Sequence, residues 1–280
     1  GDWCPPGREA HEYKSPLAFT DTMLSKDMAD KAAFLFDKLN MPEQAAFARA
    51  LSKRWKAAVR KYLIDENTML AAGNCQTSQA MAIYYNIFEP AERKAAFEQL
   101  INLIEEKEYH LDVGVLGGRV LFHVLTDFGY SDLAFSMITR PDYPSYGNWI
   151  ARGATTLWEV FQPEGSDRIG SLNHHFWGDI SSWFTQALSG IRMAPHGEPN
   201  EVDFRPSFIS RLTHAEAFHI APAGRIASAW ERDEDDVIVL TVELPSTMHG
   251  VIRLESGYVF EDGLAYKAAE SGTYRIHSIE

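Results

Sequence analysis

The 280-residue sequence is poor in cysteine, which occurs only as Cys4 and Cys75. Two cysteines form at most one disulfide, so the chain is no disulfide-rich scaffold and its redox compartment stays open. Long apolar runs are also absent, since no segment approaches the roughly 20 apolar residues of a membrane span. The first residues show no basic-then-apolar signal pattern. We predict a globular protein without a membrane-spanning segment.

Positive charge is scarce as well. The chain carries 26 basic and 39 acidic residues, a net charge of −13, and no Lys/Arg run forms a phosphate-binding stripe. Nucleic acid and anionic membranes are therefore excluded as expected partners. The motifs GxGxxG, GxSxG, HExxH and CxxC and the P-loop lysine motif are all missing, which argues against nucleotide, serine-hydrolase and zinc chemistry. We predict no cofactor and no metal.

Hydrophobic residues make up 45% of the chain, and over the first two thirds they follow a helical period. Phe47, Leu51, Trp55, Ala58 and Tyr62 define one such face after a Pro-first, acid-early start. Short connections rich in Gly, Pro, Asn and Ser predict antiparallel neighbours, that is, helical hairpins side by side. The predicted helices span 16–39, 42–64, 76–88, 90–107, 118–128, 131–140, 150–161 and 178–190.

The pattern changes after "GIRMAPHGEPNE". From about Asp203 onward, short β-branched runs such as "RIASAWE", "VIVLTVEL", "GVIRLESG" and "TYRIHSI" are separated by turn residues. These runs predict an antiparallel sheet region. We place the boundary between a mainly helical domain, 1–196, and a β domain, 197–280.

One acidic residue, Glu159, follows a tryptophan and a run of small and hydroxyl residues. The stretch "GATTLWEVF" places Glu159 behind Trp158, and a helix over 150–161 would put Thr155, Thr156 and Glu159 close to one face. Partial burial raises a carboxyl pKa and hydrogen bonds to the ionised form lower it, so such a pocket suits an acid or a base. The alternative is a solvated glutamate near a helix end.

Two further stretches favour a hydroxyl-rich ligand. "SLNHHFWGD" offers Asn173 and His174 as hydrogen-bonding groups, and "GDW" pairs Asp2 with Trp3. Sugars present polar edges and apolar C–H faces, so carboxylates beside indoles suit them. The adjacent histidines form no metal motif, and Asn173 alone is equally consistent with a cap of the next helix. We read "GNCQTSQA" and "HLDVGVLGG" as caps and tight helix contacts.

Taken in order, "GDWCPPG", "QTSQAMAI", "HLDVGVLGG", "GYSDLAFSMI", "YPSYGNWIARGATTLWEVF" and "SLNHHFWGDISSWFTQALSGI" resemble the later part of an α-L-rhamnosidase catalytic domain of glycoside hydrolase family 78. "GATTLWE" followed by "SLNH" is the most specific part. The resemblance covers nearly all of 1–191 and continues into the β region.

The resemblance implies an (α/α)6 barrel followed by a C-terminal β-sandwich, and an inverting exo-glycosidase that acts on terminal α-L-rhamnosides. Glu159 matches the general base that activates water. Asp2, Trp3 and His174 match residues that line the rhamnose pocket. The family's general acid lies ahead of the "GDW" loop, so the expected partners are a rhamnose-containing glycan or glycoside and an N-terminal part of the same protein.

About eight predicted helices cannot close a barrel of twelve, so we expect a partial barrel that supplies the base but not the acid and is inactive alone. Two other functions stay open. One is a different glycan-active enzyme on the same fold, such as an unsaturated uronyl hydrolase, and the other is a non-catalytic glycan-binding protein. The compartment is left open between bacterial periplasm, extracellular space and cytoplasm.

Overall fold

A computed structural model describes residues 1–166, 170–195 and 197–279. The chain packs into two compact units, each treated by itself below. Unit 1 comprises Gly1–Val124 and Ser136–Gly178, and unit 2 comprises Leu125–Phe135 and Asp179–Glu280. The predicted domain boundary at 196/197 therefore falls within unit 2.

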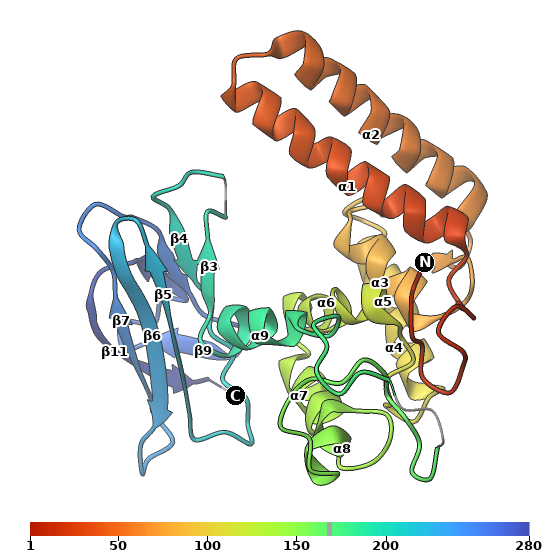
Figure 1. The fold of residues 1–280 in the computed structure, drawn as a ribbon. Coiled ribbons are helices and arrows are strands. Elements are labelled where there is room, and N and C mark those ends of the chain that lie inside the picture. Colours follow the sequence, from red (N-terminus) through yellow and green to blue (C-terminus); the bar gives the residue numbers. More distant parts are fainter. Residues whose placement is uncertain (167–169, 196, 280) are drawn as a thin grey trace. The chain divides into compact units, whose positions relative to one another are not determined.

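Unit 1 is built from helices and loops (Figure 1). Its longest elements form an antiparallel hairpin in which Pro42 opens the second helix at its first position, as predicted. Phe19 and Met23 of the first helix are fully buried. The elements that lie wholly in this unit are α1 (Leu17–Lys38), α2 (Pro42–Leu63), β1 (Ile64–Asp65), β2 (Leu70–Ala71), α3 (Gln76–Tyr84), α4 (Arg93–Glu105), α5 (Val115–Gly118) and α8 (Tyr146–Ala151).

Helix α3 is the buried centre of unit 1, and its polar side chains hold loops in place. Gln79 donates to the carbonyls of Met69 and Ala96 and accepts from the N–H of Ala71. Gln76 accepts from the N–H of Asp112 at 3.0 Å. Because every such bond satisfies a group that burial would otherwise leave unpaired, the "QTSQ" stretch is structural, as predicted.

Unit 2 is a two-sheet sandwich around one hydrophobic core. The small sheet has the order β10-β8-β4-β3 and the large sheet β5-β6-β7-β11-β9. Alternation along β6 turns Ile226 and Trp230 inward, where they meet Phe204 and Ile252 of the small sheet. The strands are β3 (Ile191–Met193), β4 (Val202–Phe204), β5 (His214–Ala221), β6 (Gly224–Arg232), β7 (Ile238–Glu243), β8 (Val251–Arg253), β9 (Tyr258–Phe260), β10 (Tyr266–Ala268) and β11 (Gly272–Ser278).

The strand pairs are antiparallel except for β4 and β8, which run parallel at Phe204 and Ile252. The antiparallel β domain is thus confirmed, with one parallel pair that the sequence did not predict. The unit also contains α9 (Asp179–Trp183) and a π-helix, η1 (Phe184–Leu188), in place of the single helix predicted over 178–190.

Other predicted helices are confirmed with shorter bounds, including 16–39, 42–64, 76–88 and 90–107. The helix predicted over 118–128 is confirmed with shorter bounds as α6 (Leu121–Asp127), the short helix α5 before it was not predicted, and α7 (Ser131–Thr139) matches its prediction. The helix predicted over 150–161 is wrong. Helix α8 ends at Ala151, and Gly153 follows with a φ of +84°, a left-handed conformation that a helix cannot continue through.

Neither cysteine forms a disulfide, and both are buried. Across the described ranges, no helix has both the length and the apolar composition needed to cross a bilayer. Within the same ranges, no group of three His, Cys, Asp or Glu side chains is arranged to hold a metal ion.

Candidate active site

Glu159 lies on an extended segment that pairs with a second one. The N–H of Glu159 donates to the carbonyl of Ser171 at 2.8 Å, and the N–H of His174 donates to the carbonyl of Leu157 at 2.8 Å. The hydroxyl of Thr156 also donates to the carbonyl of Leu172. The "TLWE" and "SLNH" stretches are therefore held side by side in antiparallel directions. The helical face predicted for Thr155, Thr156 and Glu159 does not exist.

The Glu159 carboxylate is partly exposed and is oriented by the backbone. Its Oε2 accepts a hydrogen bond from the N–H of Ser171 at 2.9 Å. A Cβ at Gly170 would come within 3.2 Å of that same oxygen, so glycine permits the close approach of the two segments. The carboxylate is fixed in direction while part of it stays accessible, which is what a proton acceptor at a binding surface requires.

Aromatic rings pack against the segment that carries Glu159. Trp177 is 2% exposed, and its Nε1–H donates to the carbonyl of Glu159 at 2.9 Å. Phe161 packs edge-on against Trp177 and stacks on Trp149 with ring centroids 4.2 Å apart. Buried indoles of this kind pack rigidly and leave their N–H for a directed bond. The sequence pattern did not reveal that Trp177 anchors the backbone of Glu159.

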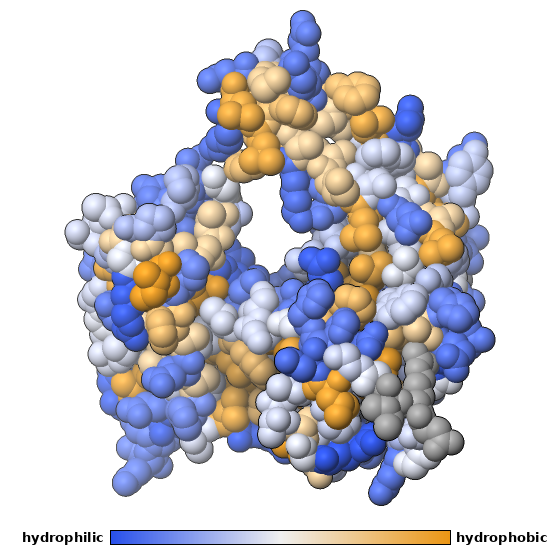
Figure 2. All heavy atoms as spheres, viewed as in Figure 1, coloured by the Kyte–Doolittle hydropathy of each residue, from blue (hydrophilic) through white to orange (hydrophobic). Residues whose placement is uncertain are grey.

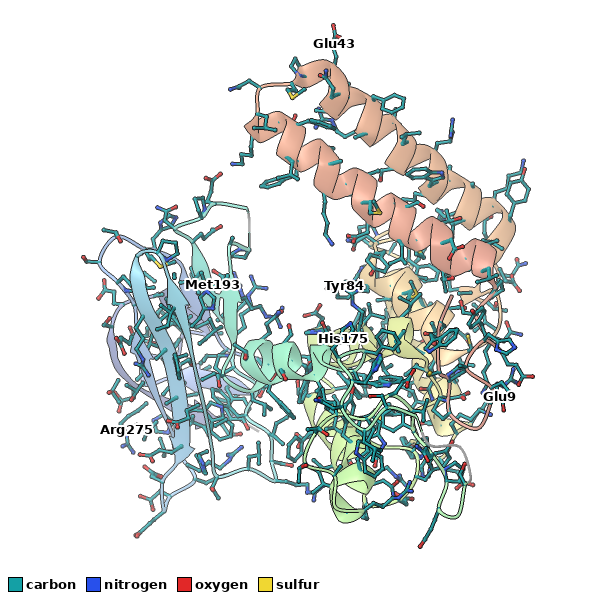
Figure 3. All side chains as sticks on the ribbon, viewed as in Figure 1. Glu9, Glu43, Tyr84, His175, Met193 and Arg275 are labelled. Carbon is teal, nitrogen blue, oxygen red and sulfur yellow. The ribbon has the colours of Figure 1, made fainter. Side chains whose placement is uncertain are left out.

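His174 brings a second polar group to the same pair of segments. Its ring packs against Phe176 at 4.1 Å and stacks on His175 at 5.3 Å, and Figure 3 labels His175 in the loop that precedes α9. Among the described residues, Nε2 of His174 is buried without a hydrogen-bond partner. A buried polar atom of this kind favours an external partner, because leaving it unpaired costs free energy.

Asp2 occupies a different environment from the one predicted. It is 1% exposed, and its carboxylate accepts from the hydroxyl of Thr77 and from the N–H groups of Gly114, Leu116 and Gly117 at 2.5–3.0 Å. Burial raises the pKa of Asp2, and these four hydrogen bonds oppose that rise. The carboxylate is thus engaged within the protein, at the start of α5.

Trp3 stays at the surface beside it. Trp3 is 37% exposed, and its carbonyl accepts a hydrogen bond from the N–H of Val115 at 2.9 Å. A Cβ at Gly114 would lie 2.3 Å from the carbonyl oxygen of Asp2 and 2.6 Å from that of Trp3, so only glycine allows this approach. The "GDW" loop and the "GVLGG" stretch are therefore packed together.

Helix α5 connects this loop to Glu159. Gly117 donates its N–H to Asp2, and a Cβ at Gly118 would lie 2.7 Å from the ring of Trp177. Trp177 in turn holds the carbonyl of Glu159. The structure thus joins Glu159 and His174 directly through paired segments, and links Asp2 and Trp3 to them through α5 and one indole ring.

Unit 1 belongs to the class of helical-hairpin domains, and it gathers a carboxylate, indoles and an imidazole on paired loop segments. Residues 1–188 match the family model of the bacterial alpha-L-rhamnosidase 6 hairpin glycosidase domain, and residues 200–257 match that of the bacterial alpha-L-rhamnosidase C-terminal domain. The chain belongs to the bacterial α-L-rhamnosidase family. The predicted resemblance to α-L-rhamnosidases is confirmed over both domains.

The similarity to known proteins extends over nearly the whole chain. The α-L-rhamnosidases of Streptomyces avermitilis and Alteromonas sp. (strain LOR) are each 28% identical to it, over 99% and 100% of its length. The structure of a Streptomyces avermitilis α-L-rhamnosidase complexed with L-rhamnose matches 99% of this chain with a TM-score of 0.85 and 27% identity. That of the Aspergillus terreus enzyme matches 98% with a TM-score of 0.86, and at 23% identity it supports the fold alone.

The chain spans less than a third of the length of these relatives. It covers 28% and 32% of the two curated sequences, and 28% and 32% of the two solved chains. Activity, substrate and partners of the whole protein are accordingly matters of proposal.

Proposed function

We propose that the protein containing this chain hydrolyses terminal α-L-rhamnosides with inversion, and that Glu159 is its general base. The observation that carries the proposal is the partly exposed Glu159 carboxylate, oriented by the N–H of Ser171 and anchored by Trp177. The Streptomyces avermitilis structure of matching fold is a complex with L-rhamnose, which supports a rhamnoside as the substrate.

In this mechanism Glu159 accepts a proton from water, and the water oxygen attacks the anomeric carbon. The bond from that carbon to the leaving oxygen breaks, and a general acid protonates that oxygen. Inversion requires the two carboxyl groups to lie about 6.5–9.5 Å apart, with the water beside the base. We place the acid outside residues 1–280, so residues 1–280 alone should show no turnover.

The sugar contacts follow from exposure and unmet hydrogen bonds. Trp3 offers a partly exposed indole face for the apolar side of a pyranose ring. His174 is half-buried, and we propose that its ring turns to bring the buried, unpartnered Nε2 to a sugar hydroxyl. Asp2, predicted to line the pocket, has its carboxylate occupied here, and we propose that it serves the site by holding the loop that carries Trp3.

The remainder of the barrel is the proposed partner of unit 1. Large apolar side chains on the α1–α2 hairpin lie in solvent, among them Met28 (70% exposed) and Phe47 (67% exposed). Figure 2 shows apolar residues over this hairpin. Apolar surface in water costs about 25 cal/mol per Å², so these faces favour packing against further helices of the same protein.

The test uses the full-length protein with an aryl α-L-rhamnoside. Glu159→Gln should lower kcat by roughly 10³-fold or more with little change in fold, because general-base catalysis supplies about that factor. Glu164→Gln, an exposed acid nearby, is the matched control and should stay within about twofold of wild type.

Near-normal turnover by Glu159→Gln would remove this residue from the mechanism. Binding of rhamnose without turnover by the unmodified full-length protein would favour a glycan-binding function. Turnover of unsaturated uronides but not of rhamnosides would favour the uronyl hydrolase alternative.

A further inference from the structure

Three arginines project from one face of the small sheet in unit 2. Arg192 on β3 lies opposite Asp203 on β4, and Arg205 follows two residues later on the same side. The parallel pairing of Phe204 with Ile252 places Arg253, one residue beyond Ile252, on that side too. Because side chains alternate along strands, all three arginines point away from the core.

A cavity of about 370 Å³ lies over this face, which is within the range of small-ligand sites, about 300–1,000 Å³. The three arginines line it together with Asp127 at the end of α6 and Glu255 after β8. All of its lining residues belong to unit 2. Met193, labelled in Figure 3, marks the neighbouring end of β3.

Some N–H groups of these guanidinium groups have no hydrogen-bond acceptor among the described residues. Arg192 donates from Nη1 to Asp127 at 3.0 Å, but its Nε is buried and without a partner among the described residues. Arg205 donates to Asp203 through Nε and Nη2. Arg253 has no acidic partner in the described part of the chain, and its closest recorded aromatic neighbour is the Tyr266 ring at 5.9 Å.

The acidic groups do not balance this charge. Asp127 and Asp203 each offset one arginine. Glu255 instead accepts from the N–H of Phe208 at 2.8 Å, and burial raises its pKa to about 7. At pH 6 the Glu255 carboxyl is mostly protonated, so one positive charge is left over.

We propose that this cavity binds an oxyanion group, a carboxylate or a sulfate, borne by an acidic sugar or free in solution. Guanidinium groups donate in a planar fork that matches such oxygens, and a buried unpaired Nε–H gains an acceptor when the anion binds. The site lies in a different unit from Glu159 and is independent of the proposed hydrolysis.

Calorimetric titration of the full-length protein at low salt tests the site with three probes: sodium sulfate, methyl glucuronide and the neutral methyl glucoside. One or both anions should saturate, and the glucoside should not bind. Tighter binding of the glucuronide identifies a sugar carboxylate as the ligand, and binding of sulfate alone identifies a free oxyanion.

Arg253→Gln is the decisive variant, because Arg253 is exposed and its loss disturbs no ion pair. It should weaken anion binding about tenfold or more, since hydrogen bonds to charged groups contribute at least that factor. Arg275→Gln on the large sheet lies outside the cavity and is the control; it loses an ion pair with Asp233 but should bind the anions as wild type does. Rhamnoside turnover should be unchanged in both variants.

Failure of both anions to saturate at millimolar concentration would overturn the proposal. Equal affinity of the Arg253→Gln variant and the Arg275→Gln control would do so too. Thermal unfolding of each variant verifies that the fold is intact.

Discussion

The two units each contain a carboxyl group whose pKa is raised by burial, and they treat it differently. Asp2 in unit 1 accepts four hydrogen bonds, three of them from backbone N–H groups. Glu255 in unit 2 accepts one, from Phe208. Backbone donors cannot reverse their role, so the Asp2 site requires an acceptor on both oxygens, whereas the Glu255 site tolerates a neutral side chain. A buried acid is therefore structural where donors surround it and pH-sensitive where they do not.

The largest effect is expected from Asp2→Asn. The amide NH₂ would face N–H groups at the start of α5 and leave buried donors unpaired, at a cost of roughly 3 kcal/mol or more in the free energy of unfolding. Chemical denaturation at pH 7 measures this change. Wild-type stability in the variant would show that the carboxylate is not required.

The matched change in unit 2, Glu255→Gln, should have the opposite sign. The folded-state pKa of Glu255, about 7, lies above the ordinary value of 4.5. Folded protein therefore holds the proton more tightly, and the stability contributed by this group is full below pH 4.5 and lost as pH rises through 7. Glutamine has no proton to lose, so the variant should gain on wild type by up to about 3 kcal/mol between pH 4.5 and 8.

Denaturant unfolding across that pH range checks this prediction, and the groups that face Glu255 define its background. Asp132 on α7 raises its pKa by repulsion, and Arg232 on β6 opposes that rise. A difference between variant and wild type that stays constant with pH would contradict a raised pKa at Glu255.

Gly118→Ala tests the link between the Asp2 loop and Glu159. The added methyl group would lie 2.7 Å from the Trp177 ring, so that ring or α5 must shift, at about 1–3 kcal/mol. We expect kcat on a rhamnoside to fall with stability, because Trp177 holds the backbone of Glu159. Gly272→Ala adds a methyl group in open space at a φ outside the left-handed region, as at Gly118, and is the matched control. Equal kcat in the two variants would break the proposed link.

The smallest effects on stability are expected from two threonine substitutions, which distinguish the observed loop from the helix predicted over 150–161. Thr156→Ala removes the hydroxyl bond to the carbonyl of Leu172 and should cost about 1 kcal/mol. Thr155→Ala removes an exposed side chain and should stay within about 0.5 kcal/mol. If both threonines lay on one helical face, both substitutions would lower the stability by similar amounts. Similar losses of stability in thermal unfolding would therefore contradict the loop.

Residue periodicity predicted most of the fold because its long helices and central strands each bury one regular face. The strands β6, β7 and β11 follow that rule. Helix α2 forms as predicted but buries Ala45, Ala48, Ser52 and Val59, and it leaves Phe47 and Tyr62 of the predicted apolar face exposed. Strand β5 escaped prediction because its outward side carries Phe218 and Ile220 while alanines face inward, which reverses the usual pattern. Strands β3 and β4 are too short for any period to show.

The sequence named candidate site residues, whose roles stay predictions, but it did not predict their local geometry. "GATTLWE" and "SLNH" named Glu159 and His174, yet helical spacing misplaced Glu159, since Gly153 ends α8 by its positive φ. The pairing of the two stretches depends on backbone hydrogen bonds between residues far from each other in a helical reading. Asp2 was identified as polar beside Trp3, but nothing local to "GDW" reveals donors contributed by residues 77 and 114–117.

Azide rescue of Glu159→Gln tests the central claim most directly. A general base is not needed when the nucleophile is already an anion, so azide should restore turnover of an aryl α-L-rhamnoside at least tenfold and give the β-linked rhamnosyl azide, identified by NMR. Rescue that gives the α-linked azide, or no rescue with hydrolysis unimpaired, would contradict the assignment of Glu159 as the water-activating base.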